Sequence, residues 1–259
     1  MDFDVLDKQM RSFEQSLDRV MLKGIFLVAR LDGHGFTKLT KQQLDLEKPF
    51  DVRFRDMMIS TLRRLMNCGF RVVYGYTQSD EISILFHFEE NTFSRKERKL
   101  LSILAGEASA TFSLLAGCPA VFDCRLVPLP QVDDVIDYFR WRQEDANRNA
   151  LNSHCYWLLR KEGLSVTAAS QQLKGASVSD KNELLFSRGI NYNDLPLWQK
   201  RGVGLYYFEE QRQGFNPKTQ EATTCKRNVL NVDMELPIGQ EYSTFLKNIL
   251  GNSNKESNK

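Results

Sequence analysis

The chain has 259 residues, with 35 Lys and Arg against 33 Asp and Glu, for a formal net charge of +2 at pH 7. This length can bury the core of one sizeable domain with an appendage, or of two small domains. The charge balance excludes an overall positive field, so any surface for a nucleic acid must be a local patch. The five cysteines form no C-x-x-C pair, and no run approaches the roughly 20 apolar residues of a membrane span. We therefore expect a cytoplasmic protein with free thiols and no membrane attachment.

The first half of the chain predicts alternating strands and helices. Apolar runs rich in β-branched and aromatic residues predict strands at 24–31, 70–76, 82–88 and 120–127. Apolar residues at helical spacing predict a helix over 51–68, and a second helix from a capping box at Ser94 and Glu97 to Gly117. The order β-α-β-β-α-β is that of the ferredoxin-like α+β fold, in which the first two strands are parallel and the third lies antiparallel between them.

The second half of the chain predicts helices followed by a hairpin. Helical spacing predicts three helices, over 135–160, over 166–173 and from a cap at Asp180 and Glu183 to Gly189. Two apolar segments predict the strands of a long C-terminal β-hairpin, at 203–209 and 222–232. The predicted turn of this hairpin is 214–217, and the polar segment 251–259 predicts a disordered tail.

The predicted topology brings three acidic residues to one edge of the sheet. Asp32 directly follows the first strand, while Asp80 and Glu81 lie in the tight connection between the second and third strands. Mg²⁺ prefers hard oxygen ligands, and enzymes that transfer phosphoryl groups often hold two such ions about 4 Å apart. Adjacent carboxylates in a tight hairpin repel each other, and a bound cation would relieve that repulsion. These three residues are therefore candidate metal ligands.

Spacing alone favours a simpler interpretation of the same residues. Asp32 would then be part of a turn that follows a strand, and Asp80 with Glu81 part of a solvated hairpin loop. The local pattern alone is compatible with both a metal site and ordinary turns.

The segments around these acidic residues resemble a known family. Residues 30–36 (RLDGHGF) and 76–83 (YTQSDEIS) resemble the two signature segments of the tRNA-histidine guanylyltransferase family. Further family-like segments follow in the same order, over most of the chain to about Pro196: 122–125 (FDCR), 137–143 (DYFRWRQ) and 180–186 (DKNELLF). The resemblance implies a polymerase-palm fold and makes the metal site the preferred interpretation. It also implies a palm-like catalytic core at 1–135 and a helical and β-hairpin extension at 136–250, before the tail at 251–259.

The resemblance further implies roles for individual residues. Two Mg²⁺ ions would be bound by Asp32, the Gly33 carbonyl, Asp80 and Glu81. The implied catalytic residues are Asp32, Ser79, Asp80 and Glu81. The residues implied to bind the nucleotide or its phosphates are Gly33, His34, Gly35, Phe36, Lys48, Asp51, Ser79, Arg95, Lys96 and Lys99. The implied RNA contacts are Arg125, Asn149, Lys181 and Asn182.

Two of these assignments have simpler alternatives in the sequence itself. His34 is compatible with an ordinary loop histidine, which the sequence alone favours. The basic residues at 95–99 occupy the first turns of a predicted helix, where backbone amides favour anions, and they are equally compatible with a solvated charged face.

One segment departs from the family pattern. Where the eukaryotic histidine-tRNA enzymes carry His-Ile-Asn-Asn-Leu-Tyr-Asn, residues 147–153 are Asn-Arg-Asn-Ala-Leu-Asn-Ser. The chain is in this respect similar to the guanylyltransferase-like subgroup, which implies template-dependent 3′-to-5′ addition that repairs 5′-truncated tRNA. ATP or GTP would activate the 5′ end, and the assembly would be a homotetramer. The alternatives are guanylate addition to histidine tRNA, a nucleotidyl cyclase and a non-catalytic RNA-binding module.

Overall fold

The computed structural model describes residues 2–216 and 221–256. Its strands are β1 (Phe26–His34), β2 (Val72–Gln78), β3 (Glu81–Phe86), β4 (Val121–Leu129), β5 (Val203–Asn216) and β6 (Glu221–Asp233). Its α-helices are α1 (Phe3–Gln15), α2 (Phe36–Gln42), α3 (Val52–Leu65), α4 (Glu97–Ala116), α5 (Val132–Lys161), α6 (Val166–Leu173), α7 (Val178–Phe186), α8 (Leu197–Arg201) and α9 (Gly239–Glu256). Two 3₁₀ turns are η1 (Thr92–Arg95) and η2 (Tyr192–Asp194). The turn predicted at 214–217 is wrong for 214–216, which belong to β5, and its last residue lies outside the described residues.

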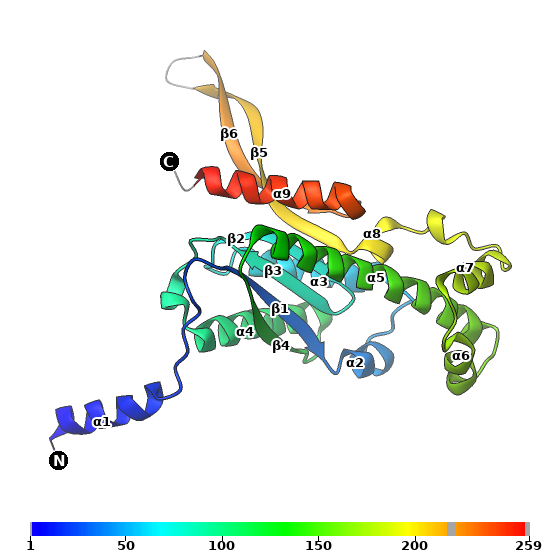
Figure 1. Cartoon of the computed structure of the whole chain (residues 1–259), viewed down its shortest axis with the longest axis horizontal. Coiled ribbons are helices and arrows are strands. Elements are labelled where there is room, and N and C mark those ends of the chain that lie inside the picture. The colour runs from blue at the N-terminus through cyan, green and yellow to red at the C-terminus, as the bar shows by residue number, and fades with distance from the viewer. Residues whose placement is uncertain (1, 217–220, 257–259) are drawn as a thin grey trace.

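The strands form one antiparallel six-stranded sheet in the order β4-β1-β3-β2-β5-β6 (Figure 1). β1 and β2 both pair antiparallel with β3 and are therefore parallel to each other, so the predicted ferredoxin-like α+β arrangement is confirmed. β5 pairs with β2 over Val203–Tyr206, so the C-terminal hairpin continues the same sheet. The outer part of the hairpin, where β5 and β6 pair with each other, projects away from the body (Figure 1).

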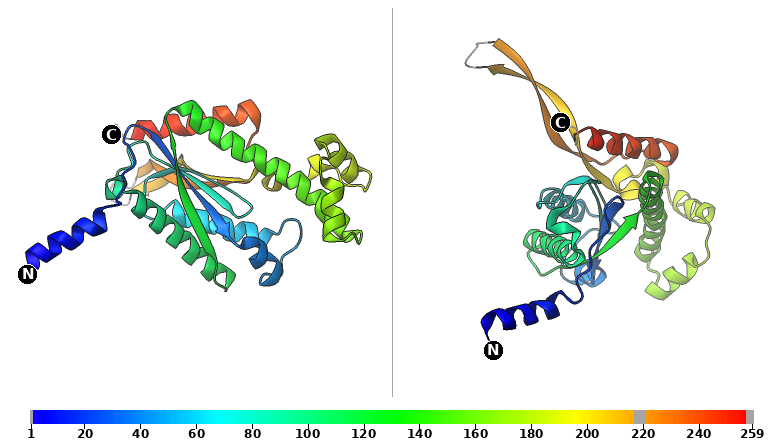
Figure 2. Two further views of the ribbon diagram at one scale, coloured as in Figure 1. Left: turned by 60° about the horizontal axis from the view of Figure 1, so that its bottom comes forward. Right: turned by 60° about the vertical axis from the view of Figure 1, so that its left-hand side comes forward.

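Helices cover both faces of the sheet (Figure 2). The alternation of side chains along β1 turns Leu31 towards α3 and α4, and Val28 towards α5 and α9. Leu62 of α3 and Phe139 of α5 are both 0 % exposed, so each face carries its own apolar core. Burial of one such side chain contributes about 1.5–3 kcal/mol, and these cores fix the rim on which the acidic residues lie.

Helix α4 is long and apolar enough, by length and composition, to cross a membrane, which differs from the expectation that no segment approaches that size. No other described helix meets this criterion, and a single helix that does is weak evidence because core helices also do so. Leu100, Leu104 and Phe112 of α4 are at most 1 % exposed and belong to the core that α4 shares with α3 and β1. This packing is that of a core helix in a globular domain.

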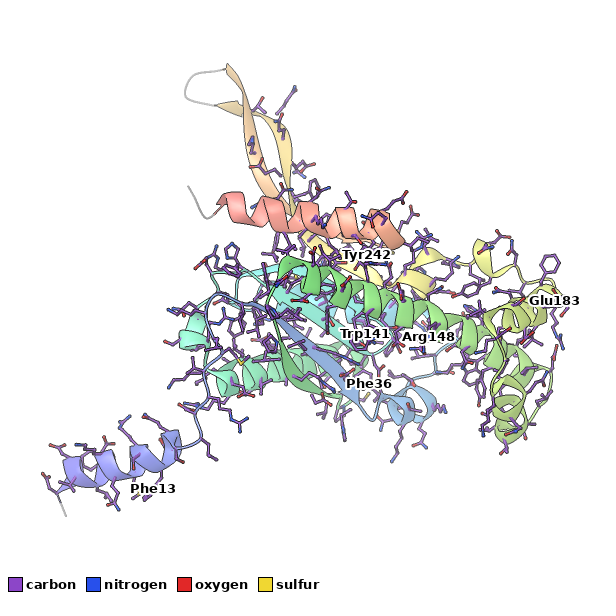
Figure 3. The ribbon with its side chains drawn as sticks, viewed as in Figure 1. Phe13, Phe36, Trp141, Arg148, Glu183 and Tyr242 are labelled. Carbon is purple, nitrogen blue, oxygen red and sulfur yellow. The ribbon has the colours of Figure 1, made fainter. Side chains whose placement is uncertain are left out.

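The 30-residue helix α5 links the sheet to a small lobe. Its first half covers the sheet, whereas Ala150 and Cys155 in its second half pack with Ala169 of α6 and Leu185 of α7. The lobe lies beyond the end of the sheet (Figure 1). Helix α1, near the N-terminus, has no buried residue. It projects away from the rest of the chain, and the label of Phe13 marks its position in Figure 3.

Several local predictions are wrong. The capping box at Ser94 and Glu97 is absent, because Ser94 has left-handed backbone (φ 53°) inside η1 and α4 starts directly at Glu97. Helix α7 is capped instead by Ser177 with Asp180, three residues before the predicted cap. Residues 251–256 belong to α9 and not to a disordered tail, whose remaining positions lie outside the described residues. Four helices, α1, α2, α8 and α9, are not predicted from the sequence.

Candidate active site

The β2–β3 hairpin and the end of β1 bring the three predicted acidic residues together. Asp32 lies directly opposite Glu81 in the β1–β3 ladder. The turn between β2 and β3 consists of Ser79, whose φ of 49° is left-handed, and Asp80. The backbone N–H of Gly33 donates to the Asp80 carbonyl at 3.0 Å, which fixes the turn against β1. The ladder register therefore produces the predicted convergence.

Glu81 differs from the other two because its carboxylate is already bound. It is 4 % exposed, and its two oxygens accept hydrogen bonds from Nε and Nη2 of Arg142 in α5, each at 2.7 Å. Arg30 lies 3.1 Å from one of the same oxygens. Burial raises the pKa of Glu81, and the Arg142 guanidinium opposes that rise. Glu81 is thus a buried counter-ion, and its expected place in the metal ligand set is not supported.

The residues that fit a divalent cation are Asp32 and Asp80, with the backbone carbonyl of Gly33 available beside them. Burial raises the pKa of the Asp80 carboxyl, and the nearby charge of Asp32 adds to the effect. A cation between these carboxylates would remove that repulsion. Among the described residues, no group of three or more His, Cys, Asp or Glu side chains is arranged to hold a metal.

Two arginines already contact Asp32. Its oxygens accept hydrogen bonds from Arg30 at 2.8 Å and from Arg125 at 3.0 Å. Arg125, predicted as an RNA contact, is 58 % exposed and can leave the carboxylate without losing a packed environment. Arg30 is more enclosed and also contacts Glu81, so it links the half-buried Asp32 carboxylate to the buried Glu81 carboxylate.

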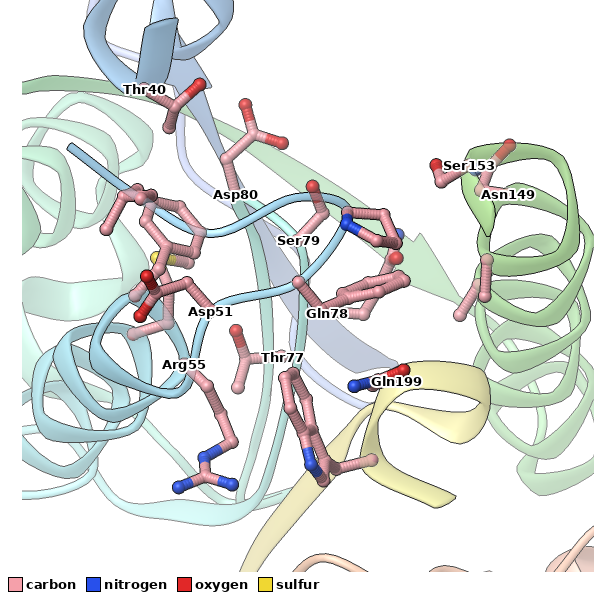
Figure 4. Close-up of a pocket in the computed structure, with 18 of the residues that line it drawn as sticks. Thr40, Asp51, Arg55, Thr77, Gln78, Ser79, Asp80, Asn149, Ser153 and Gln199 are labelled. Atoms are coloured by element: carbon pink, nitrogen blue, oxygen red, sulfur yellow. The ribbon is translucent and has the colours of Figure 1, made fainter. Parts of the chain in front are cut away.

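A pocket of about 220 Å³ opens beside the β2–β3 turn (Figure 4). Its walls come from α2, the segment between α2 and α3, α3 itself, the end of β2 with the turn, α5, α8 and the start of β5. The predicted site residues that line it are Phe36, Lys48, Asp51, Ser79, Asp80 and Asn149. Further lining residues that the sequence analysis does not identify include Thr40, Arg55, Gln78, Ser153, Trp198 and Gln199. The pocket thus places two cations, Lys48 and Arg55, within reach of a ligand that lies next to Asp80.

Lys48 and Arg55 are held in different ways. The Lys48 ammonium donates to the Thr40 carbonyl at 3.2 Å, and burial, with the charge of Lys41, lowers its pKa. The Arg55 guanidinium lies 4.9 Å from the centre of the Trp198 ring, a distance suited to a cation–π contact. Arg55 also pairs with Asp56 through Nε and Nη2, each at 2.8 Å. The N–H groups of Lys48 and Arg55 that these contacts leave unused are the donors that an anion can use.

Asp51 supports the pocket wall from behind. Its carboxylate caps α3 by accepting from the Arg53 backbone N–H at 2.7 Å, and it accepts from the Glu47 N–H at 2.8 Å. The Arg53 guanidinium also pairs with it at 2.6 Å. These bonds hold the pKa of Asp51 well below its usual range, the Arg53 side chain being the largest cause. The supporting role expected for Asp51 therefore has a physical basis.

We expect Asp51→Asn to lower the free energy of unfolding at pH 7 by about 1–3 kcal/mol, because a charged helix cap and its ion pair are lost. A depressed carboxyl pKa stabilises the fold above the unfolded value of about 4, and that stability is lost as the pH falls through the lower folded pKa. The deficit should therefore shrink below pH 4. Urea unfolding followed by circular dichroism measures it, with the exposed Asp45→Asn as the control. Equal stability of Asp51→Asn and the parent protein at pH 7 would contradict the assignment.

Packing and backbone conformation account for the glycines and Phe36 of the predicted nucleotide-binding loop. A Cβ at Gly33 would lie 2.5 Å from Cγ of Phe36, so only glycine allows this ring to pack there. Gly35 precedes α2 with a left-handed φ of 72°. Phe36 itself is 3 % exposed, inside the body (Figure 3), and forms part of the apolar core as well as the pocket. His34 is exposed at the end of β1 and does not line the pocket.

The predicted phosphate cluster at the start of α4 lies at the other end of the sheet. Arg95 is buried and donates to the Ile25 carbonyl at 3.4 Å, and Lys96 pairs with Asp18 at 3.0 Å. Asp32 is seven residues beyond Ile25, about 23 Å away at the rise of a strand. Within one copy of the chain, Arg95, Lys96 and Lys99 therefore cannot reach this pocket, and the expected role does not hold there.

The remaining predicted RNA contacts lie apart from one another. Asn149 lines the pocket and donates to Asp145 at 3.1 Å. Lys181 and Asn182 are on α7, in the lobe, and neither lines this pocket. Arg142 is the functional neighbour that the sequence analysis misses, because only the path of α5 over the sheet brings it to Glu81.

Comparisons with known proteins agree with this geometry. The family model "tRNAHis guanylyltransferase" matches residues 7–130, and the model of the Thg1 C-terminal domain matches residues 133–240. A probable tRNA(His) guanylyltransferase of Drosophila melanogaster is 36 % identical over 206 residues, which are 75 % of this chain and 71 % of the relative. The tRNA(His) guanylyltransferase of Neurospora crassa is 36 % identical over 199 residues, 72 % of this chain and 68 % of the relative.

Solved structures show the same similarity. A bacterial Thg1-like protein in complex with ATP superposes with a TM-score of 0.75 at 26 % identity, covering 95 % of this chain and 99 % of that one. The tRNA(His) guanylyltransferase of Saccharomyces cerevisiae gives a TM-score of 0.69 at 27 % identity, covering 76 % of this chain and 91 % of that one. The chain therefore belongs to the tRNA(His) guanylyltransferase family, a family of nucleotidyltransferases.

Proposed function

We propose that the chain repairs 5′-truncated tRNA by template-dependent 3′-to-5′ nucleotide addition. The observation that carries this proposal is that Ala150 and Ser153, two residues that differ from the motif of the histidine-tRNA enzymes, line the pocket beside the β2–β3 turn; Ser153 is labelled in Figure 4. They belong to the segment 147–153, which departs from the pattern of the eukaryotic histidine-tRNA enzymes. The departure therefore changes a surface that a bound nucleotide would contact. The high coverage by a bacterial Thg1-like protein supports the same subgroup.

The proposed substrates besides tRNA are ATP and GTP. Similar bacterial proteins are described in complex with ATP and with GTP, and both similarities extend over 95 % of this chain. Lys48 and Arg55 in the pocket are suited to triphosphate oxygens, since both are cations with free donors. Phe36 and Trp198 provide apolar surface beside them.

The proposed reaction has two displacements at phosphorus. First, a 5′ phosphate oxygen of the tRNA attacks the α-phosphorus of ATP or GTP, pyrophosphate leaves, and a 5′-to-5′ linked end forms. Then the 3′ hydroxyl of the incoming nucleotide attacks the 5′ phosphorus of the tRNA, and AMP or GMP leaves. The opposite strand of the acceptor stem selects the added base by pairing. No protein nucleophile takes part, so the protein acts by positioning and by neutralising charge.

The chain's own residues supply much of that neutralisation. Lys48 and Arg55 would hold the phosphates, and the left-handed turn at Ser79 presents Asp80 to the pocket. Mg²⁺ bound by Asp32, Asp80 and the Gly33 carbonyl would supply charge stabilisation on the phosphoryl oxygens. The proposed assembly is a homotetramer. A chain with a net charge of +2 needs the local basic patches of several copies to cover a tRNA.

A repair assay tests this function. A labelled tRNA that lacks its first nucleotide is incubated with the protein, ATP, GTP and Mg²⁺, and the 5′ end is sequenced. We expect the missing nucleotide to be restored, and we expect the added base to change when the opposing template base is changed. Intact histidine tRNA should not be extended, and the nucleotides without RNA should give no cyclic product. Untemplated guanylate addition to histidine tRNA, without repair of the truncated tRNA, would contradict the proposal.

A further inference from the structure

A second cavity, of about 490 Å³, lies on another side of α5 and shares no lining residue with the active-site pocket. Its walls come from α5, α7, η2, α8 and the start of α9. Trp198 and Gln199 of α8 face the active-site pocket, while Lys200 and Arg201 line this cavity. Helices α5 and α8 therefore separate the active-site pocket from this cavity, and each helix lines both.

The charges on the cavity wall are unbalanced. Arg140, Lys200 and Arg201 line it, and Glu144 is the one carboxylate among its lining residues. The Arg140 guanidinium makes no hydrogen bond with any described residue. Its ion pairs with Asp137 at 3.6 Å and with Glu144 at 4.0 Å are long, and its Nε is buried without a partner. A buried donor without a partner is uncommon, and here it lies at a cavity with an excess of positive charge.

Lys200 is the second unusual cation. Its side chain is buried, at 7 % exposure, and its ammonium donates to the backbone carbonyls of Tyr192 at 3.1 Å and Asn193 at 2.8 Å. No described carboxylate lies within ion-pair distance of it. An ammonium has three donors, so one remains for a ligand. Burying a charge without a counter-ion is unfavourable, and an anion in the cavity would offset that cost.

The remaining lining residues suit a nucleobase better than an inorganic anion. Asn147, Asn182 and Asn193 line the cavity, the amide nitrogen of Asn182 also donating to the Val178 carbonyl at 2.9 Å. Leu151, Val178 and Ile238 add apolar surface. The Asn147 carbonyl oxygen accepts from the Tyr192 hydroxyl at 2.9 Å, while its amide nitrogen donates to no described residue. Amide groups read the edges of bases, and apolar side chains cover their faces.

We propose that this cavity binds one nucleotide unit, with its phosphate at Arg140, Lys200 and Arg201 and its base against the Asn amides. The unit comes either from an unpaired position of an RNA strand or from a free nucleotide. Binding at this cavity is non-covalent and does not depend on a ligand in the active-site pocket. If the nucleotide unit belongs to an RNA strand, this site adds an RNA contact to the proposed tRNA repair and rests on that function. If the unit is a free nucleotide, the site is independent of the proposed function.

Two binding measurements with one pair of variants test the proposal. Arg140→Gln removes the guanidinium together with its two long ion pairs, to Asp137 and Glu144, and breaks no hydrogen bond with a described residue. Arg148→Gln, on the same helix (Figure 3) but outside both cavities, is the matched control. The probes are an unstructured RNA decamer, followed by fluorescence anisotropy, and GTP, followed by calorimetry. A photoreactive 4-thiouridine in the decamer then locates the contact by peptide mapping.

We expect Arg140→Gln to weaken binding of one probe about tenfold, and Arg148→Gln to change it less than twofold. Weaker decamer binding, with a salt slope smaller by about 0.7 and cross-links to α7 or η2, which line only this cavity, would identify RNA as the source. Weaker GTP binding alone would identify a free nucleotide. Unchanged affinity for both probes would overturn the proposal. Because repair of truncated tRNA by the parent protein is scored separately, failure of this inference is distinguishable from failure of the proposed function.

Discussion

Asp80→Asn is expected to reduce nucleotide addition about a thousandfold, the size of effect seen when a group that stabilises transition-state charge is removed. The change keeps the shape of the side chain at the β2–β3 turn but removes its charge. Both displacements should slow, because the same carboxylate faces the phosphates in each. Binding of tRNA should stay within about threefold of the parent protein, since one carboxylate contributes little to an interface that phosphate contacts dominate. Single-turnover assays of activation and of addition, with filter binding of tRNA, measure these quantities.

The control for this variant is Asp133→Asn, an exposed carboxylate in the first turn of α5 that lines neither cavity. It should add nucleotides at the parental rate. Raising Mg²⁺ should not rescue Asp80→Asn, because the missing charge is part of the site. If Asp80→Asn adds nucleotides normally at saturating Mg²⁺, then the catalytic centre lies elsewhere in the molecule.

The convergence of Asp32 and Asp80 could be predicted from the sequence because it depends only on strand order. Apolar runs located the strands, and the right-handed crossover left one sensible arrangement for four of them. In that arrangement the end of β1 and the β2–β3 turn must share an edge. The end of the first strand differs from the prediction, because β1 continues through Asp32 to His34 and Asp32 therefore lies inside the ladder and not after it.

The same strand order could have excluded the phosphate role of Arg95, Lys96 and Lys99. Helix α4 follows β3, and β3 starts at the turn and runs away from it, so α4 must begin at the opposite edge. The amphipathic stripe of α9 was also present in the sequence, since Tyr242, Leu246 and Leu250 recur every four residues.

The partner of Glu81 could not be predicted from local patterns. It depends on how α5 crosses the sheet, which is decided by the packing of Val135 and Phe139 on Tyr74 and their neighbours. Asp80 lies in the turn, whereas Glu81 is the first residue of β3 and lies directly opposite Asp32, on the same face of the sheet. What separates Glu81 from Asp32 and Asp80 is therefore its pairing with Arg142 of α5, which no local pattern in the sequence indicates.

Arg142→Met is expected to lower the free energy of unfolding by about 3–5 kcal/mol, because it leaves the buried Glu81 carboxylate without its bidentate partner. Burial already raises the pKa of Glu81, and without the guanidinium that rise should increase. A carboxyl whose folded pKa is raised destabilises the protein once the pH exceeds the unfolded value of about 4.3, so the deficit should be larger at pH 7 than at pH 4.

The double variant Glu81→Leu with Arg142→Met separates a structural pair from a metal ligand. If Glu81 serves only Arg142, replacing both with apolar residues should recover most of the lost stability, since a buried pair contributes little beyond what apolar packing can supply. Urea unfolding of the two single variants and the double variant gives the coupling energy directly. A single variant Arg142→Met as stable as the parent protein would mean that Glu81 is not held by Arg142. The carboxylate would then be free to join Asp32 and Asp80, and the site would again have three acidic ligands.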